Sequence, residues 1–180
     1  MTARLTSIGA RALLLALAWS LTGCLSWRVT AIAGPGTIDP SLKVIALAPG
    51  DGLLTDLVGF ALAEEGYTIV DTGTTLAVLM FLQERQENIL TPQVTSALRR
   101  RHIDAILAVH QVKNSNHLPQ KVTAQLYSTG DATMLCHSEW HTGWSQRGPV
   151  DAAREIATTL LKCLERPSDR VETPSLSDSP

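Results

Sequence analysis

Residues 103–112, near the middle of the chain, are apolar on both faces apart from Asp104, His110 and Gln111. A strand with apolar side chains on both faces is buried on both sides, as happens at the centre of a sheet that helices cover. The run therefore predicts a central strand, and the rest of the chain has to supply the sheet and the helices around it.

Further strands are predicted from short apolar or alternating runs, at 27–32, 43–48, 67–70, 121–127 and 132–140. Residues 121–127 alternate apolar and polar side chains, which is typical of a strand with one exposed face. Thr129-Gly130-Asp131 is a turn sequence, so we expect this strand and the next one to form a hairpin.

Four helices are predicted. The first is capped by Asp51 and ended by Gly66, and the second begins at Thr74 or Thr75 and runs through Leu76, Leu79, Met80 and Leu82. The third runs from Thr91-Pro92 to His102, and the fourth is capped by Asp151. From residue 43 onward the order is β-α-β-α-α-β-β-β-α. This order predicts an α+β (α/β-like) domain in which the helices cover one face of a mixed sheet.

The N-terminus has the pattern of a secretory signal. Arg4 and Arg11 give it positive charge, and residues 12–21 form a short apolar run that ends in Leu21-Thr22-Gly23-Cys24. An uncleaved membrane anchor is the alternative, but only 16 residues separate Arg11 from Arg28. A spanning helix needs about 20 apolar residues, so we expect a cleaved leader over 1–23.

Leu21-Thr22-Gly23-Cys24 resembles the lipobox of bacterial lipoproteins. The resemblance implies that Cys24 carries covalent lipid such as palmitate, and that the chain has no other cofactor. Several acyl chains on one residue form an effectively permanent anchor. No Asp follows the cysteine, which in this family favours the periplasmic face of the outer membrane. Cys136 and Cys163 would then share an oxidising compartment, either as a disulfide or, as we slightly favour, as two buried free thiols.

The chain is thus expected to divide into a leader over 1–23, a lipidated tether over 24–42, a folded domain over 43–166 and a disordered tail over 167–180. The tether contains Gly34-Pro35-Gly36 and Asp39-Pro40, and the tail is rich in Ser, Pro and Asp. Fully extended, such a tether spans at most about 60 Å.

Four phrases of the domain resemble the curli-secretion-channel (CsgG-like) family and its relatives: Lys43 to Pro49, Phe81 to Gln86, His102 to Val109 and Gln125 to Gly130. The relatives include PelC-like exopolysaccharide-export lipoproteins and lipoprotein activators of penicillin-binding proteins. The resemblance implies a CsgG/TolB-N-like fold over roughly 43–166. The chain lacks the inserted pairs of alternating strands that a membrane pore needs, which favours the accessory members of the family over the channel.

Two groups of side chains are candidates for contacts. Arg99, Arg100 and Arg101 end the third predicted helix, where they would complement the helix dipole or, as the less favoured alternative, bind an anionic partner.

Trp140 and Trp144 lie near a strand end. One of them is expected in the core. The other is expected at the membrane or a partner, as PelC-like rings are thought to present aromatic side chains, and Trp144 is the better candidate.

Catalysis, metal binding and nucleic-acid binding are not predicted. No Ser-His-Asp or Cys-His signature is present. His137 and His141 lie on a strand, where four residues span about 13 Å, too far for one metal ion. The whole chain has a formal charge of −2 and residues 1–23 hold two arginines, so the remainder has a charge of −4. An acidic domain has no general attraction to nucleic acid.

These observations lead to one expectation with two alternatives. We expect a non-enzymatic, lipid-anchored accessory of outer-membrane export or envelope assembly, with polysaccharide export as the resemblance implies. Its partners would be copies of itself, as in a ring, and another envelope protein. A lipoprotein that binds and activates a peptidoglycan synthase is the first alternative, and a periplasmic hydrolase is the second.

Overall fold

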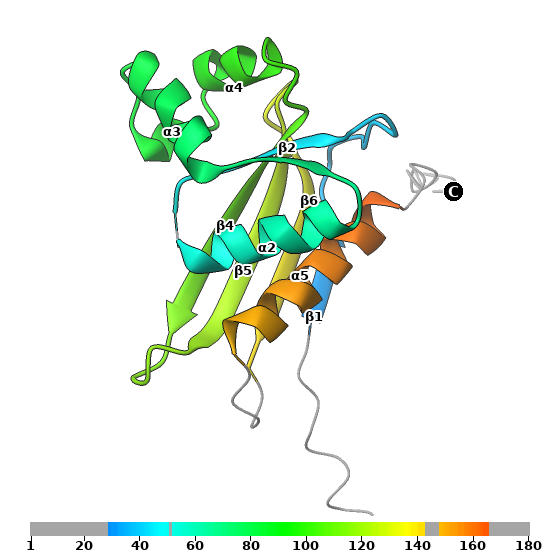
Figure 1. Cartoon of the computed structure of the whole chain (residues 1–180). Helices are drawn as coiled ribbons and strands as arrows, with labels where there is room; N and C mark the ends of the chain where they lie inside the picture. The colour runs from blue at the N-terminus through cyan, green and yellow to red at the C-terminus, as the bar shows by residue number, and fades with distance from the viewer. Residues whose placement is uncertain (1–28, 51, 143–147, 166–180) are drawn as a thin grey trace, which may run out of the picture.

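The computed structural model describes residues 29–50, 52–142 and 148–165. Six strands form one mixed sheet in the order β1-β6-β5-β4-β2-β3 (Figure 1). They are β1 (Val29–Ala33), β2 (Val44–Leu47), β3 (Thr68–Val70), β4 (Ala105–Lys113), β5 (Pro119–Ser128) and β6 (Met134–His141). Strand β2 is parallel to β3 and β4, and the other pairs are antiparallel. The predicted α+β class with a mixed sheet is confirmed.

The described residues also form four helices and one short 3-10 helix: α2 (Leu53–Glu64), α3 (Thr72–Phe81), η1 (Gln86–Asn88), α4 (Pro92–Arg99) and, after the last strand, α5 (Pro149–Leu164). Helices α2 and α5 pack against one face of the sheet, and α3 and α4 pack against the other (Figure 1). The prediction that all helices cover one face is therefore wrong.

The direction in which the chain moves through the sheet explains this arrangement. The chain passes from β2 outward to β3 through α2, and then returns past β2 to β4 through α3 and α4. Crossovers between parallel strands are almost always right-handed. Two right-handed crossovers in opposite directions place their helices on opposite faces of the sheet.

Strand β4 contributes to both resulting cores, as a central strand should. Ala105, Leu107 and Val109 pack into the core beneath α2 and α5, whereas Ile106 packs into the core beneath α3 and α4. Beyond Val109 the strand leaves the α3–α4 layer, and its later residues become exposed. The predicted central strand is confirmed for its first half.

Several predicted helix ends lie elsewhere in the structure. Asp71, rather than Thr74 or Thr75, caps α3, and its carboxylate accepts hydrogen bonds from the backbone N–H and hydroxyl of Thr74 at 2.9 and 2.7 Å. These bonds lower the pKa of Asp71 below its usual value. Gly148, not Asp151, is the N-cap of α5.

The end of α4 and the start of α2 also differ from the prediction. Helix α4 ends at Arg99, three residues before the predicted end, and His102 follows in a left-handed conformation with φ 59°. Asp51, the predicted cap of α2, lies outside the described residues, and Gly52 is the N-cap.

Strand β1 brings the N-terminal segment into the sheet. It pairs along its whole length with β6, from Val29 opposite Trp140 to Ala33 opposite Cys136. Gly34 and Gly36 continue this pairing, since their N–H groups donate to Leu135 O at 2.8 Å and to Met134 O at 3.1 Å. The short strand predicted at 27–32 is thus found at 29–33, as one edge of the sheet.

The close approach of β1 to β6 requires glycine at position 34. A Cβ atom there would lie 1.9 Å from the carbonyl oxygen of Met134. We expect Gly34→Ala to lower the free energy of unfolding by about 1–3 kcal/mol, because the strand edge must shift to make room. Chemical denaturation measures this loss, with Gly50→Ala as the control, since a Cβ at position 50 meets only an ordinary contact at 3.5 Å. Equal stability of the two variants would show that β1 is not held at this place.

Candidate functional site

The start of β1 fixes where a lipid on Cys24 would hold the domain. Residues 29–42 contribute β1 and the buried side chain of Leu42 to the fold, so only residues 25–28 separate Cys24 from the sheet. Five Cα–Cα steps extend to at most about 18 Å. The segment free to act as a tether is therefore much shorter than the expected 24–42.

Strand pairing identifies which end of the sheet lies beside this segment. Val29 is opposite Trp140, and the next residue of β6, His141, is opposite Lys121 near the start of β5. The β4–β5 hairpin and the first turn of α5 lie at the same end (Figure 1). We call this end, defined by Val29, Lys121 and His141, the anchor end.

Trp144 and Cys24 both lie outside the described residues. The neighbours of Trp144 along the chain are placed: Thr142 donates its N–H to Gln120 O at 3.0 Å, and Gly148 begins α5. Both lie at the anchor end. A membrane or partner contact by Trp144 remains a prediction, as does the acylation of Cys24.

Of the two candidate tryptophans, Trp140 is the one that lies in the core, as expected for one of them, so it is not available as an exposed contact. Its side chain is 1 % exposed, and its Nε1–H donates to Glu155 Oε2 on α5 at 2.7 Å. The alternation of β6 explains the placement, because Cys136, Ser138 and Trp140 share the face that α5 covers.

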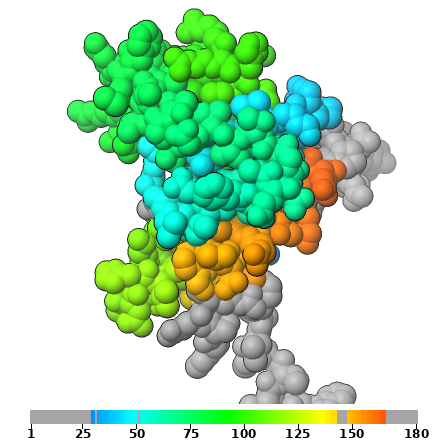
Figure 2. Space-filling view, in the orientation of Figure 1, coloured from blue at the N-terminus to red at the C-terminus, as the bar shows by residue number. Residues whose placement is uncertain are grey.

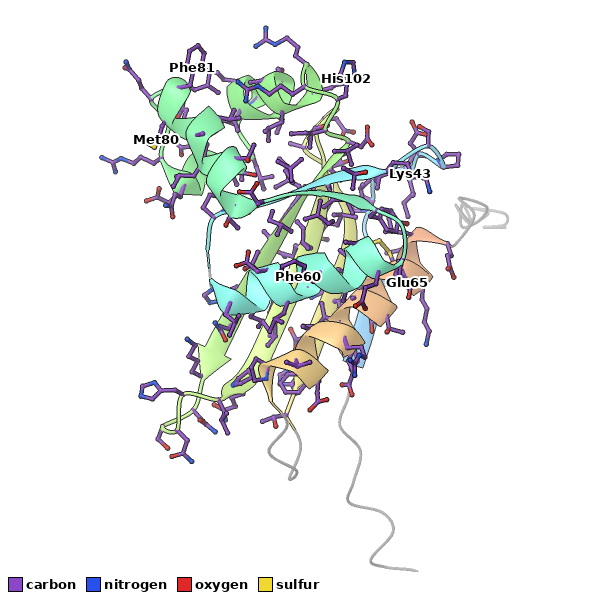
Figure 3. The ribbon with its side chains drawn as sticks, viewed as in Figure 1. Lys43, Phe60, Glu65, Met80, Phe81 and His102 are labelled. Atoms are coloured by element: carbon purple, nitrogen blue, oxygen red, sulfur yellow. A yellow bond between two sulfur atoms is a disulfide. The ribbon has the colours of Figure 1, made fainter. Side chains whose placement is uncertain are left out.

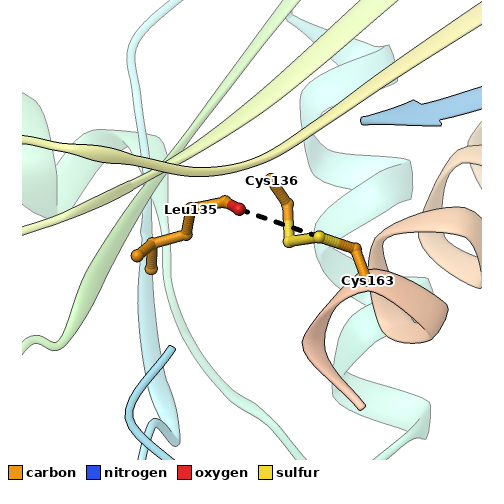
Figure 4. Close-up of a disulfide and its surroundings, with 3 residues drawn as sticks. All are labelled: Leu135, Cys136 and Cys163. Atoms are coloured by element: carbon orange, nitrogen blue, oxygen red, sulfur yellow. Dashed lines mark hydrogen bonds between the residues drawn. A yellow bond between two sulfur atoms is a disulfide. The ribbon is translucent and has the colours of Figure 1, made fainter. Parts of the chain in front are cut away.

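Cys136 on β6 and Cys163 on α5 form a disulfide, with their Cα atoms 6.2 Å apart (Figure 4). Both residues are buried, and the Cys163 sulfur lies 3.7 Å from the Leu135 carbonyl oxygen. The preference for two free thiols is therefore wrong. A bond of this kind persists only in an oxidising compartment in most organisms.

A small ion cluster lies on the sheet face opposite α5, at the anchor end. Glu139 contacts Lys121 Nζ at 2.8 Å and His141 Nε2 at 2.5 Å. Hydrogen bonds from Lys121 and then His141 lower the pKa of Glu139 from 4.5 to about 2. The cluster joins a charged side chain of β5 to two side chains of β6 on this face.

The lowered pKa predicts a pH dependence of stability. A carboxyl with a depressed pKa stabilises the folded state fully above its unfolded pKa, near 4.5, and loses this contribution as the pH falls toward 2. We expect the stability difference between the wild type and Glu139→Gln to shrink over this range, by a small amount because the pair is exposed. Urea denaturation as a function of pH measures it, with Glu64→Gln as the control. A difference that is unchanged from pH 7 to pH 2 would contradict the ion cluster.

The opposite end of the sheet carries a polar junction built by two of the motif residues. The Asp104 carboxylate accepts from the N–H groups of Lys43 and Val44, both at 2.9 Å. The Thr129 hydroxyl donates to Ile103 O at 2.6 Å and lies 3.0 Å from Asp104 O. These bonds join β2, β4 and the β5–β6 turn, so the motif residues that carry the resemblance hold the fold together.

A polar pocket of about 290 Å³ opens at this junction. Asp39, Ser41, Arg99 and His102 are among the residues that line it. Hydrogen bonds from Ser41 lower the pKa of Asp39. Lys121 at the anchor end and Ser128 at the pocket are seven residues apart along β5, which corresponds to about 23 Å.

The three predicted arginines do not act as one group. Arg99 lies in the last turn of α4 and lines the pocket, whereas Arg100 and Arg101 follow the helix and are exposed. Their position suits the helix dipole, as favoured from the sequence. His102 projects from the same end of α4 (Figure 3).

Among the described residues, no group of three or more His, Cys, Asp or Glu side chains is placed to hold a metal ion. Within the same ranges, none of the helices has the length and apolar character needed to cross a membrane.

Sequence reasoning missed an exposed set of large apolar side chains on α2 and α3. Leu53 and Phe60 on α2 are 67 % and 68 % exposed, and Met80 and Phe81 on α3 are 69 % and 79 % exposed (Figure 3). Helix α3 has apolar residues on most sides, so its sequence does not define which side faces the sheet. For Phe60 a signal existed, since it lies outside the inward apolar stripe of its helix.

No family model and no curated protein matches the chain. It is similar in structure to a PelC dodecamer from Paraburkholderia phytofirmans, at 15 % identity and a TM-score of 0.47 over 77 % of this chain and 97 % of that one. It is also similar to the LpoB C-terminal domain from Salmonella enterica, at 16 % identity and a TM-score of 0.45 over 62 % and 87 %. A lipoprotein from Neisseria meningitidis gives 13 % identity and a TM-score of 0.43 over 68 % and 97 %.

Proposed function

We propose that this chain is a lipoprotein of the outer membrane that serves export or envelope assembly as a non-enzymatic accessory. The process is polysaccharide export, and the working form is an oligomer that meets another envelope protein. One observation carries the proposal: the lipobox cysteine lies five residues before an edge strand of the sheet. Acylated Cys24 would hold the anchor end within about 18 Å of the bilayer.

Two further features support this placement. The Cys136–Cys163 disulfide suits the oxidising periplasm. Trp144 belongs to the segment between β6 and α5, whose two ends lie at the anchor end, so an aromatic contact with the membrane interface would reinforce the lipid. The polar pocket and the exposed arginines lie at the other end of the sheet, facing the periplasm in this orientation.

The activator of a peptidoglycan synthase is the second candidate, and the short tether disfavours it. An activator anchored in the outer membrane has to reach a synthase on the far side of the periplasm. The available segment shrinks from the expected 60 Å to about 18 Å once β1 is part of the sheet. The hydrolase alternative gains no support from the pocket. Asp104 and Thr129, which line it, are already engaged in hydrogen bonds that hold strands together.

The distance to the membrane gives a discriminating experiment. In a strain that lacks the gene, we would express the wild type, Cys24→Ser, and a variant with about eight Gly and Ser residues inserted after Ser26. The insertion adds up to about 28 Å of reach while keeping the lipid. We would measure released polysaccharide, peptidoglycan cross-linking and the membrane fraction that holds each protein.

The proposal predicts that only the wild type restores full polysaccharide release. Cys24→Ser should leave the membrane fraction, and the insertion variant should stay in the outer membrane but lose release. Restored peptidoglycan cross-linking, unimpaired or improved by the insertion, would favour the activator instead. Full function of Cys24→Ser would contradict both.

A further inference from the structure

Both phenylalanines of this chain lie on its surface. The sequence contains only Phe60 and Phe81, and their side chains are 68 % and 79 % exposed (Figure 3). Each has an apolar companion: Leu53 lies two turns before Phe60 on α2, and Met80 precedes Phe81 on α3. Grouped exposed apolar side chains of this size commonly mark interaction surfaces. We call Leu53 with Phe60 the α2 patch, and Met80 with Phe81 the α3 patch.

The two patches belong to opposite helical layers. Helix α2 packs with α5 on one face of the sheet, and α3 packs with α4 on the other. In the space-filling view α3 and α4 form a lobe beyond the α2–α5 layer (Figure 2). The patches therefore do not form one continuous surface, and a single flat partner would not cover both.

The segment that carries the α2 patch and the segment that follows the α3 patch have opposite formal charges. From Leu53 to Gly66 the charged side chains are Asp56, Glu64 and Glu65, with no lysine or arginine. From Leu82 to His102 there are four arginines against Glu84 and Glu87, a formal charge of +2. Arg100, Arg101, Glu64 and Glu65 are exposed. An acidic helix with exposed apolar side chains thus lies on one layer, and on the other layer the α3 patch is followed by a segment of net positive charge that ends in exposed arginines.

We propose that the α2 patch of one copy packs against the α3 patch of the next copy, with Glu64 and Glu65 facing the basic end of α4. The proposal deepens the oligomeric part of the proposed function. The contact joins two different surfaces, so it is heterologous, and each dimer keeps one free patch of each kind. Repetition of such a contact closes into a ring or continues as a chain. Phe60 and Phe81 act as its central anchors.

Complementary variants test this geometry. We would use the full mature chain, residues 24–180 with Cys24→Ser, exported behind an ordinary secretory signal so that no lipid drives association. Sedimentation velocity over a concentration series would compare Phe60→Ser, Phe81→Ser and their mixture. Val150→Ser is the matched control, because Val150 is 51 % exposed on α5 and belongs to neither patch.

The wild type and Val150→Ser should assemble beyond dimers. Each phenylalanine variant alone should assemble at least about 30-fold more weakly, as expected for the loss of a central aromatic anchor. Their mixture should form heterodimers and nothing larger, because only the intact α2 patch of one variant and the intact α3 patch of the other can meet.

A charge exchange gives an independent arm. Glu64→Lys with Glu65→Lys, and Arg100→Glu with Arg101→Glu, should each weaken assembly alone. Mixed together, the two variants should assemble beyond dimers again, since every contact then joins opposite charges.

Four results would overturn the proposal: a monomeric wild type, phenylalanine variants that assemble as the wild type does, single variants that still form stable dimers, or a mixture of them that assembles beyond dimers. If the wild type assembles and neither phenylalanine substitution weakens that assembly, the oligomer of the proposed function is retained and only this interface is ruled out. The experiments on Cys24 measure lipidation and membrane placement separately. A failure of the proposed function can therefore be distinguished from a failure of this interface.

Discussion

Trp140→Ala is expected to lower the free energy of unfolding by about 3–5 kcal/mol. The indole is 1 % exposed, and it fills the space between β6 and α5 next to the α2–α5 core. Alanine would leave a cavity there and remove the hydrogen bond to Glu155 at 2.7 Å. Chemical denaturation of the mature chain, followed by circular dichroism, measures the loss.

Trp140→Phe is the matched control. It keeps most of the apolar volume and removes the Nε1–H donor, so we expect a smaller loss of about 1–2 kcal/mol. If Trp140→Ala instead left stability unchanged and weakened membrane association, Trp140 would be a surface contact after all.

Loss of the Cys136–Cys163 bridge is expected to lower the free energy of unfolding by about 3.5 kcal/mol, from the entropy of closing a loop of this length in the unfolded chain. The two cysteines are 27 positions apart and join the end of α5 to β6. Denaturation curves with and without reductant measure the loss, and the double variant Cys136→Ala with Cys163→Ala should be insensitive to reductant.

Thiol counting provides the control for the bridge. Protein purified from the periplasm and unfolded without reductant should expose neither Cys136 nor Cys163 to a thiol reagent. Two reactive thiols in that experiment, with stability unaffected by reductant, would restore the view that these cysteines are free.

Short sequence patterns, such as an apolar run or a Thr-Pro pair, predicted much of the fold. The apolar run at 103–112 correctly indicated a central strand, and Thr91-Pro92 correctly marked the start of α4. Local patterns do not report which side of a sheet a helix covers. That side depends on strand order, since the reversal of direction at β3 places α3 and α4 opposite α2.

The candidate site was less predictable because it depends on contacts between distant segments. The pairing of β1 with β6, which shortens the tether, joins residues more than 100 positions apart. The disulfide depends on the packing of α5 against β6, because Cys136 has to face that helix. One signal was overlooked: Cys136 and Trp140 lie four residues apart on a strand, so they share a face, and an inward cysteine implies an inward tryptophan.

Intact mass spectrometry of the native protein, extracted from membranes, tests the central claim most directly. We predict a chain that begins at Cys24, lacks residues 1–23 and carries the added mass of several acyl groups on that cysteine. A chain that retains Met1 and is free in the cytosol, or one with an unmodified Cys24 sulfur, would contradict the membrane placement on which the proposed function depends.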